Sequence, residues 1–115
     1  LIGLANDDKD KMVSVIKPKY IILKPSLIGG IKQSEEWISV AKKNKLQWWV
    51  TSALESNVGL NAISQWVFNK SLSMKQGLGT GQLFSNNISC SLYIKEGCLY
   101  YNPDTSWDLA FLKRF

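Results

Sequence analysis

Strand and helix signals alternate along the first two thirds of the chain, and this alternation constrains the fold more than any other feature. Residues 20–24 (YIILK) and 46–52 (LQWWVTS) are short runs rich in β-branched and aromatic side chains, which are typical of strands. A third short strand is predicted at 72–76, before a glycine loop at 77–81. Apolar residues at helical spacing precede, separate and follow the first two strands, at residues 7–17, 31–43 and 58–68. This pattern predicts an α/β fold in which parallel strands are joined by crossover helices.

The links between these segments carry residues that cap or end helices. Asp7 or Asp8 is expected to cap the first helix, and Pro18 follows its end. Residues 26–30 are expected to form a connecting loop, and Asn57 is expected to cap the third helix. Because the links are short, each strand is predicted to lead directly into the next helix.

The composition changes after residue 69. A stretch rich in Gly, Ser and Asn leads to a predicted β-hairpin with strands at 92–94 and 98–101, where Gly97 supplies the positive φ that the turn requires. The C-terminal tail has an apolar edge that is expected to pack on the rest of the protein, formed by Trp107, Leu109, Phe111 and Leu112.

Three parallel strands are too few to close a barrel and leave exposed edges. A (β/α)8 barrel needs about 250 residues, whereas this chain has 115 and begins with leucine rather than methionine. We therefore expect the C-terminal part of a larger barrel, with residues 1–81 as a partial barrel. Residues 82–115 are expected to form a C-terminal segment whose hairpin packs on the remainder of the protein.

Charge, hydropathy and cysteine content exclude several classes of protein. The net charge is +5, but lysines are interspersed with Asp and Glu and there is a single arginine, so we expect no nucleic-acid partner. No apolar run approaches the ~18 residues of a membrane span, so no membrane association is expected. Cys90 and Cys98 suit no common zinc motif and are expected to be reduced, which favours a cytoplasmic location. Histidine is absent, so any acid–base chemistry falls to Lys, Glu, Asp or Tyr.

Lys24 places a charge at the end of an apolar strand, just before Pro25. Because side chains alternate along a strand, Tyr20, Ile22 and Lys24 share one face. The functional residues of (β/α)8 barrels lie at the carboxyl ends of the strands, so Lys24 is a candidate catalytic cation. The alternative is a lysine that simply reaches solvent past the end of the sheet.

Further candidates follow the other predicted strands. Ser52 ends the second strand and is expected to lie beside Lys24, and Glu55 comes shortly after it. The alternative is that Ser52 and Glu55 only cap the helix at 58–68 or support the site from behind. The loop at 77–81 (GLGTG) exposes backbone N–H groups that can hold an anion, although such loops are often plain turns. It lacks the lysine of a Walker motif and does not match the dinucleotide-binding fingerprint.

Three motifs together resemble one enzyme family. They are ILKPSLIGG at residues 22–30, VTSALESNVGL at 50–60 and GLGTGQLFSNNI at 77–88. They resemble the C-terminal half of the o-succinylbenzoate synthase family, in the enolase superfamily. The resemblance implies a modified (β/α) barrel with an α+β capping domain, of which this chain would supply about strands six to eight and a C-terminal hairpin of the capping region.

The resemblance also implies a Mg²⁺-dependent carbon–oxygen lyase of menaquinone biosynthesis. This dehydratase takes a proton from the carbon next to a carboxylate and then releases water. Lys24 matches the sixth-strand lysine that stabilises the enediolate, opposite a second-strand lysine that is expected to be the base. Ser52 matches a substrate contact, and Gly77 and Leu78 match a substrate-binding loop in which many relatives carry an acidic residue in place of Gly79.

By the same resemblance, the acidic Mg²⁺ ligands and the second lysine lie upstream of Leu1. Asp7, Asp8 and Asp10 stand at a helix start, where capping accounts for them better than metal binding. We therefore expect no metal site in this chain and no synthase activity from the chain alone. The expected partners are a small-molecule carboxylate and the remainder of the barrel and capping domain, with self-association where that remainder is missing.

Two other functions stay open on the sequence. The first is a dipeptide epimerase or N-succinylamino acid racemase of the same superfamily. The second is a non-catalytic α/β module that binds an anion or a partner through the glycine loop.

Overall fold

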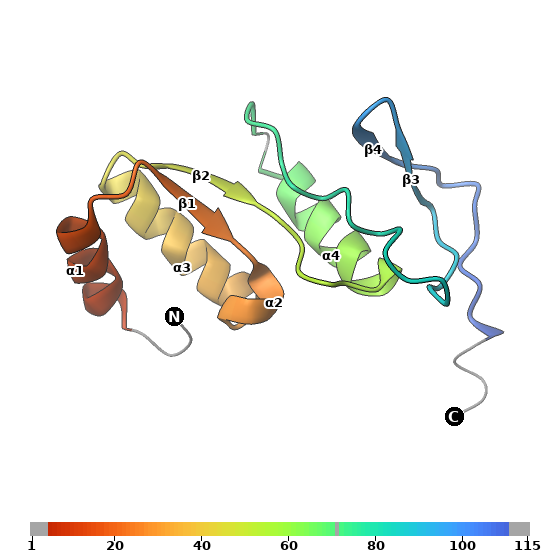
Figure 1. The fold of residues 1–115 in the computed structure, drawn as a ribbon, viewed down its shortest axis with the longest axis horizontal. Coiled ribbons are helices and arrows are strands. Elements are labelled where there is room, and N and C mark those ends of the chain that lie inside the picture. Colours follow the sequence, from red (N-terminus) through yellow and green to blue (C-terminus); the bar gives the residue numbers. More distant parts are fainter. Residues whose placement is uncertain (1–4, 71, 111–115) are drawn as a thin grey trace. The chain divides into compact units, whose positions relative to one another are not determined.

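The computed structural model describes residues 5–70 and 72–110, which fall into two compact units (Figure 1). Of these residues, the first unit comprises 5–53 and 73–77, and the second comprises 54–70, 72 and 78–110. The prediction that residues 1–81 form a partial barrel and residues 82–115 a C-terminal segment is not tested by this division and stays a prediction. Within the described ranges, no helix is both long and apolar enough to cross a membrane. In chain order the elements are α1 (Asn6–Ile16), β1 (Tyr20–Leu23), α2 (Pro25–Ile28), α3 (Gly30–Lys43), β2 (Gln47–Val50), α4 (Asn57–Phe68), β3 (Leu92–Lys95) and β4 (Cys98–Tyr101).

The first unit is a small parallel α/β structure. β1 and β2 pair in parallel, in the register that sets Tyr20 opposite Gln47 and Leu23 opposite Val50. α3 connects the two strands and contacts both, and Leu23 and Val50 are buried. The prediction of parallel strands joined by a crossover helix is therefore confirmed.

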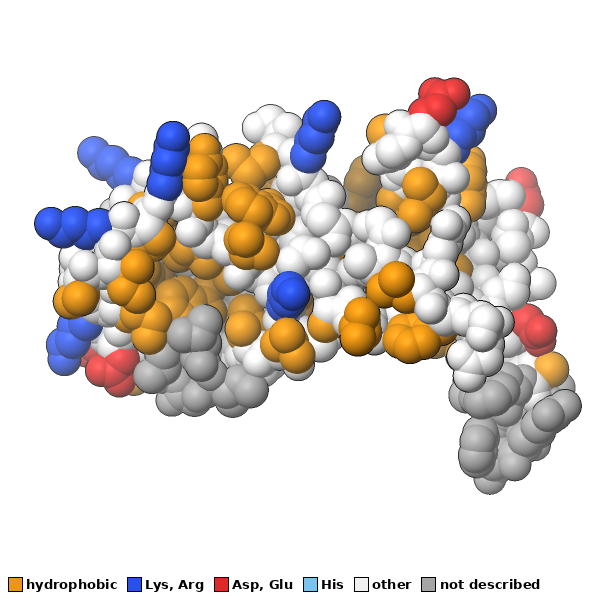
Figure 2. Space-filling model, viewed as in Figure 1, with side chains coloured by type: hydrophobic (Ala, Val, Ile, Leu, Met, Phe, Trp, Pro, Cys, Tyr) orange, Lys and Arg blue, Asp and Glu red, His pale blue; other side chains and the backbone are white. Residues whose placement is uncertain are grey.

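The opposite face of β1 is largely exposed. Tyr20 is 40% exposed and Ile22 is 52% exposed, although the apolar run at 20–24 is typical of a strand covered on both faces. Figure 2 shows hydrophobic side chains gathered over β1 and β2. A neighbouring cavity of about 220 Å³ is apolar as well, with Met12, Ile16, Ile21, Ile28 and Trp37 among its lining residues.

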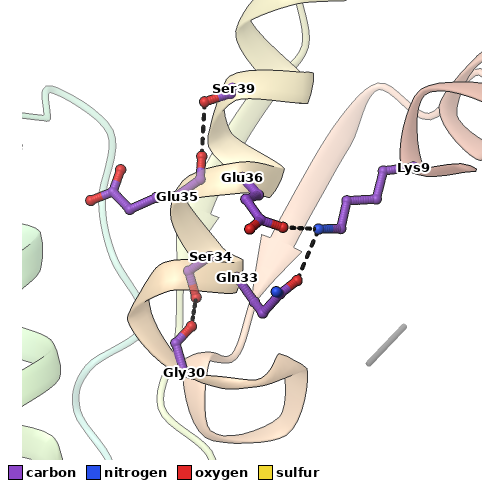
Figure 3. A network of polar contacts seen from close by, with 7 residues as sticks. All are labelled: Lys9, Gly30, Gln33, Ser34, Glu35, Glu36 and Ser39. Carbon is purple, nitrogen blue, oxygen red and sulfur yellow. Dashed lines mark hydrogen bonds and ion pairs between the residues drawn. The ribbon is translucent and has the colours of Figure 1, made fainter. Parts of the chain in front are cut away.

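A buried lysine joins α1 to α3 (Figure 3). The Lys9 side chain is 0% exposed, and its ammonium group pairs with the Glu36 carboxylate and donates to Gln33 Oε1 at 2.9 Å. Lys9 Nζ also lies 5.8 Å from the centre of the Trp37 ring. Since a buried charge is costly unless it is paired and hydrogen-bonded, these partners allow α1 to pack against α3 at this position.

A second ion pair lies between α1 and the C-terminal end of α3. Asp10 pairs with Lys43 and accepts a hydrogen bond from Asn44 Nδ2 at 2.7 Å. The hydrogen bond from Lys43 is the main cause that lowers the pKa of Asp10, and the same contact raises the pKa of Lys43. The prediction that Asp7 or Asp8 caps α1 is wrong, because the helix already begins at Asn6 and its N-cap is Ala5.

Replacing Asp10 with asparagine is expected to make the free energy of unfolding fall less steeply as the pH is lowered. Because folding lowers the pKa of Asp10, the carboxylate stabilises the folded state above its unfolded pKa of about 3.9. This contribution is lost as the pH falls through the lower folded pKa. Urea unfolding between about pH 2 and pH 6 measures the effect, which is small for an exposed pair. Asp8→Asn is the matched control, and an equal response of the two variants at every pH would contradict the prediction.

The second unit contains α4 and the β3–β4 hairpin. The hairpin and its turn are confirmed, with positive φ at Glu96 (51°) and Gly97 (74°). α4 has its N-cap at Ser56 and begins at Asn57, so the prediction that Asn57 caps this helix is wrong by one residue. The Asn57 side chain is instead engaged with a distant loop, as described below.

The described part of the tail is bonded through its main chain to the segment before β3. The Asn102 N–H donates to the Ser91 carbonyl oxygen at 2.8 Å, and the Asp108 N–H donates to the Ser89 carbonyl oxygen at 3.1 Å. Of the apolar side chains expected to pack, Trp107 is partly buried and Leu109 is exposed, while Phe111 and Leu112 lie outside the described residues.

Two short segments of the first unit differ from their predictions. The helical turn α2 (Pro25–Ile28) and the start of α3 replace the loop expected at 26–30, because Pro25 is well suited to the first position of a helix and Gly29 ends the turn with a φ of 102°. The strand expected at 72–76 does not form over those described residues. Instead, Gln76 Oε1 accepts a hydrogen bond from the Val50 N–H at 2.7 Å, so a side chain takes the place of a strand carbonyl.

Candidate active site

The carboxyl ends of three parallel segments meet at one edge of the first unit. The Thr51 N–H donates to the Leu23 carbonyl oxygen at 2.9 Å, which joins β2 to the end of β1. On the other side of β2, the Gly77 N–H donates to the Val50 carbonyl oxygen at 2.8 Å, and the Ser52 N–H donates to the Gly77 carbonyl oxygen at 3.2 Å. Thr51 and Gly77 thus form a parallel bridge, and Gly77 occupies the position of a third strand.

Lys24 stands directly after β1 at this edge. Its carbonyl oxygen accepts hydrogen bonds from the N–H groups of Leu27 (2.9 Å) and Ile28 (3.2 Å), which makes Lys24 the N-cap of α2. Its side chain is exposed and follows Tyr20 and Ile22 along the exposed face of the strand. The strand and the helical turn therefore fix the main chain of Lys24 and leave its ammonium group at the surface.

The strand register decides which residue lies next to Lys24. Because Leu23 pairs with Val50, continuing the register by one residue places Thr51 beside Lys24. Ser52 follows one position later and is only 4% exposed. Reasoning from sequence expected Ser52 beside Lys24 and missed Thr51, because the spacing along one strand does not encode its register against another.

A close contact with Thr51 requires glycine at position 77. A Cβ on Gly77 would lie 2.7 Å from Thr51 Oγ1 and 2.9 Å from Thr51 Cβ. The Thr51 hydroxyl donates to the Gly77 carbonyl oxygen at 2.8 Å, which holds the two residues together. Leu78, the next residue, belongs to the second unit and is 8% exposed. A substrate contact from Leu78 would therefore use its main chain.

Glu55 lies in the second unit, just before α4. Its carboxylate lies against the first turn of that helix, since a Cβ on Gly59 would be 2.8 Å from Glu55 Oε2. The positive end of the helix dipole favours a carboxylate at this place. This position suits the capping or supporting role that the sequence left open, and both that role and a direct one stay predictions.

Comparison with known proteins identifies relatives of this chain. No family model matches the chain. An o-succinylbenzoate synthase of Desulfotalea psychrophila is 48% identical over 99 residues, which make up 86% of this chain. The crystal structure of MenC from the same organism matches with a TM-score of 0.80 at 48% identity, again over 86% of this chain. This chain is a homologue of the o-succinylbenzoate synthases.

The homology to o-succinylbenzoate synthases covers only part of those proteins. The chain spans 27% of the length of the Desulfotalea synthase and 28% of the MenC chain in the crystal structure. The synthases of two Vibrio cholerae strains are each 38% identical over 66 residues, which are 57% of this chain and 20% of theirs. The resemblance drawn from the three motifs is therefore confirmed, for a segment of about a quarter of the Desulfotalea synthase.

The part of this synthase homologue that the structure describes does not fit a Mg²⁺ ion. It contains no group of three or more His, Cys, Asp and Glu side chains arranged to share a metal. Two acidic residues are already engaged, Asp10 with Lys43 and Glu36 with Lys9.

Proposed function

We propose that this chain is the C-terminal part of an o-succinylbenzoate synthase and that Lys24 is a catalytic residue of the whole enzyme. The homology to the Desulfotalea synthase supports the first half of the proposal. One observation carries the second half: Lys24 ends an apolar strand at the carboxyl edge of a parallel sheet, with its main chain fixed and its side chain exposed. That edge is where (β/α) barrels bind their substrates.

In this proposal, β1, β2 and the segment at Gly77 are strands six to eight of the barrel, and the β3–β4 hairpin belongs to the capping region. The exposed apolar face of β1 supports it, because Tyr20 and Ile22 would face the barrel interior once the remaining strands close the sheet. Among the described strands, β1 pairs with β2 alone. Its other edge and the adjacent apolar cavity would be covered by the preceding strand and helix of the barrel.

The proposed reaction is the loss of water from 2-succinyl-6-hydroxy-2,4-cyclohexadiene-1-carboxylate. A base removes the proton from the carbon next to the carboxylate, and the electron pair left behind places negative charge on the carboxylate oxygens. The hydroxyl on the neighbouring carbon then leaves as hydroxide and, once protonated, becomes water, which gives 2-succinylbenzoate. The Lys24 ammonium group is a cation, carried by a main chain that the strand and the helical turn fix, and it would meet the developing charge; such electrostatic stabilisation is often the largest contribution to catalysis.

The other candidate residues take supporting roles in the proposal. Ser52, Gly77 and Leu78 contact the substrate, and Glu55 holds the start of α4. We add Thr51, which is beside Lys24 in the strand register and bonded to Gly77. The base is a lysine upstream of Leu1, and the acidic residues that would bind Mg²⁺ lie upstream as well.

The test compares the 115-residue chain with the full-length protein, which in this proposal extends upstream of Leu1. The full-length protein is expected to form 2-succinylbenzoate, as measured by chromatography of the product. The chain alone is expected to form none, because the base lies outside it. Analytical ultracentrifugation of the chain alone is expected to show self-association through its exposed strand edge and apolar faces.

Three outcomes would overturn part of the proposal or favour another function. Formation of 2-succinylbenzoate by the chain alone would overturn the placement of the base upstream. Deuterium exchange at the α-carbon of an N-acyl amino acid, without dehydration, would favour an epimerase or racemase. A monomeric chain that unfolds cooperatively, together with a full-length protein that lacks both activities, would favour a non-catalytic binding module.

A further inference from the structure

Two asparagine side chains in the second unit tie the start of α4 to the segment that follows the glycine loop. Asn87 Oδ1 accepts a hydrogen bond from the Asn57 N–H at 2.8 Å, and Asn87 Nδ2 donates to the Gly81 carbonyl oxygen at 2.8 Å. Asn57 Nδ2 donates to the Ile88 carbonyl oxygen at 2.6 Å. The two asparagines therefore connect three positions of the chain: the first residue of α4, the end of the glycine loop, and Ile88.

The bond between Asn87 Oδ1 and the Asn57 N–H also caps the start of α4. The first N–H groups of a helix have no partner within it, and the N-cap Ser56 makes no side-chain hydrogen bond to them. Asn87 supplies this partner from thirty residues further along the chain. The same amide group thus caps α4 with its oxygen and holds Gly81 with its nitrogen.

Packing of α4 side chains against Gly81 also restrains the end of the loop. A Cβ on Gly81 would lie 2.6 Å from Leu60 Cδ2 and 3.0 Å from Asn57 Oδ1. Leu60 is 1% exposed, so it has little room to move aside. Glycine at position 81 therefore allows the loop end to lie directly on α4.

We propose that Asn57 and Asn87 are positioning residues that hold the glycine loop, residues 77–81, in the conformation that receives the substrate. This inference rests on the proposed function, in which Gly77 and Leu78 contact the substrate. Within the first unit, hydrogen bonds to Val50 and Thr51 fix Gly77, the first residue of the loop. Within the second unit, Asn87 fixes Gly81, its last residue.

The sharpest test is Asn87→Asp in the full-length protein. Aspartate has the same shape, and its carboxylate can still accept hydrogen bonds from the N–H groups of Asn57 and Ile88. It cannot donate to the Gly81 carbonyl oxygen, so this variant removes one bond and leaves the helix cap in place. Asn86→Asp, at the exposed neighbouring position, is the control with the same change in charge.

Two measurements are made on both variants: amide hydrogen exchange over residues 78–83, and kcat and KM for 2-succinylbenzoate formation. Asn87→Asp is expected to raise exchange in this segment about 10-fold and KM about 10-fold, because the partly buried Gly81 carbonyl loses its donor, while kcat changes less than about 3-fold. Asn86→Asp is expected to match the wild-type protein in all three quantities. Loss of packing alone would lower the fraction of folded protein without raising KM.

Asn57→Asp is a second variant in case Asn87→Asp folds poorly. An acidic residue in the first turn of α4 is favourable for the helix, so this change removes the bond to Ile88 without weakening the helix start. It is expected to raise KM about 3-fold to 5-fold. Wild-type exchange and KM in both variants would overturn the inference. A wild-type protein that forms no 2-succinylbenzoate would instead overturn the proposed function, and this result is distinguishable because it needs no variant.

Discussion

Replacing Lys24 with alanine in the full-length synthase homologue is expected to lower kcat about 1,000-fold while the protein stays folded. The exposed side chain contributes nothing to the core, whereas its ammonium group stands at the edge where the carboxylate charge would develop. Removing it leaves that charge without this cation in the transition state. The measurement is the rate of 2-succinylbenzoate formation at saturating substrate, with the thermal midpoint recorded for each variant.

The matched control for this experiment is Lys42→Ala. Lys42 is an exposed lysine in the last turn of α3, at the opposite end of that helix from the turn that follows Lys24, and its loss changes the net charge equally. Lys42→Ala is expected to keep kcat within about 2-fold, since exposed charges far from a site act weakly through solvent. A Lys24→Ala variant with near wild-type kcat would show that Lys24 merely reaches solvent at the end of β1.

Replacing Lys9 with methionine is expected to lower the free energy of unfolding by about 3 kcal/mol, because it breaks a buried ion pair from one side only. The methionine fills similar space but leaves the Glu36 carboxylate, whose side chain is 26% exposed, without its cation. Gln33 loses its donor at the same time. Urea unfolding measures this loss, followed by the fluorescence of the five tryptophans of the chain, of which Trp37 lies beside Lys9.

Two further variants distinguish the loss of the Lys9–Glu36 ion pair from a general effect of substitution in α1. Lys11→Met changes an exposed lysine of the same helix and is expected to alter stability by less than about 0.5 kcal/mol. The double variant Lys9→Met/Glu36→Leu removes both charges and is expected to recover most of the loss, since paired buried charges can often be exchanged for apolar side chains. Equal stability of Lys9→Met and Lys11→Met would contradict the role given to Lys9.

The elements predicted correctly from the sequence are those governed by local signals. Strand propensity and helical periodicity act within one segment, and they predicted β1, β2 and the crossover helix between them. The turn at Gly97 was found for the same reason, since its positive φ is a property of one residue. The three motifs likewise predicted the family, which the homology to the Desulfotalea synthase confirms.

The failed predictions at Asn57 and at 72–76 involve partners far away in the sequence, whereas those at Asp7, Asp8 and 26–30 misjudged local signals. Asp7, Asp8 and Asn57 were expected to cap helices, but α1 begins before the two aspartates, and the Asn57 N–H finds its partner in Asn87. The strand expected at 72–76 is replaced by a side-chain contact from Gln76 to β2. No local pattern reveals which distant group will satisfy a given N–H.

The sequence by itself determined that Lys24 ends an apolar strand and that the chain is related to the o-succinylbenzoate synthases. Only the tertiary structure decided that Thr51 is its neighbour in the register, that Lys9 is buried against α3, and that Asn87 holds the end of the glycine loop. The physical reason is the range of the interactions. Periodicity and propensity act along a few neighbouring residues, whereas register, burial and long-range hydrogen bonds exist only once distant segments have come together.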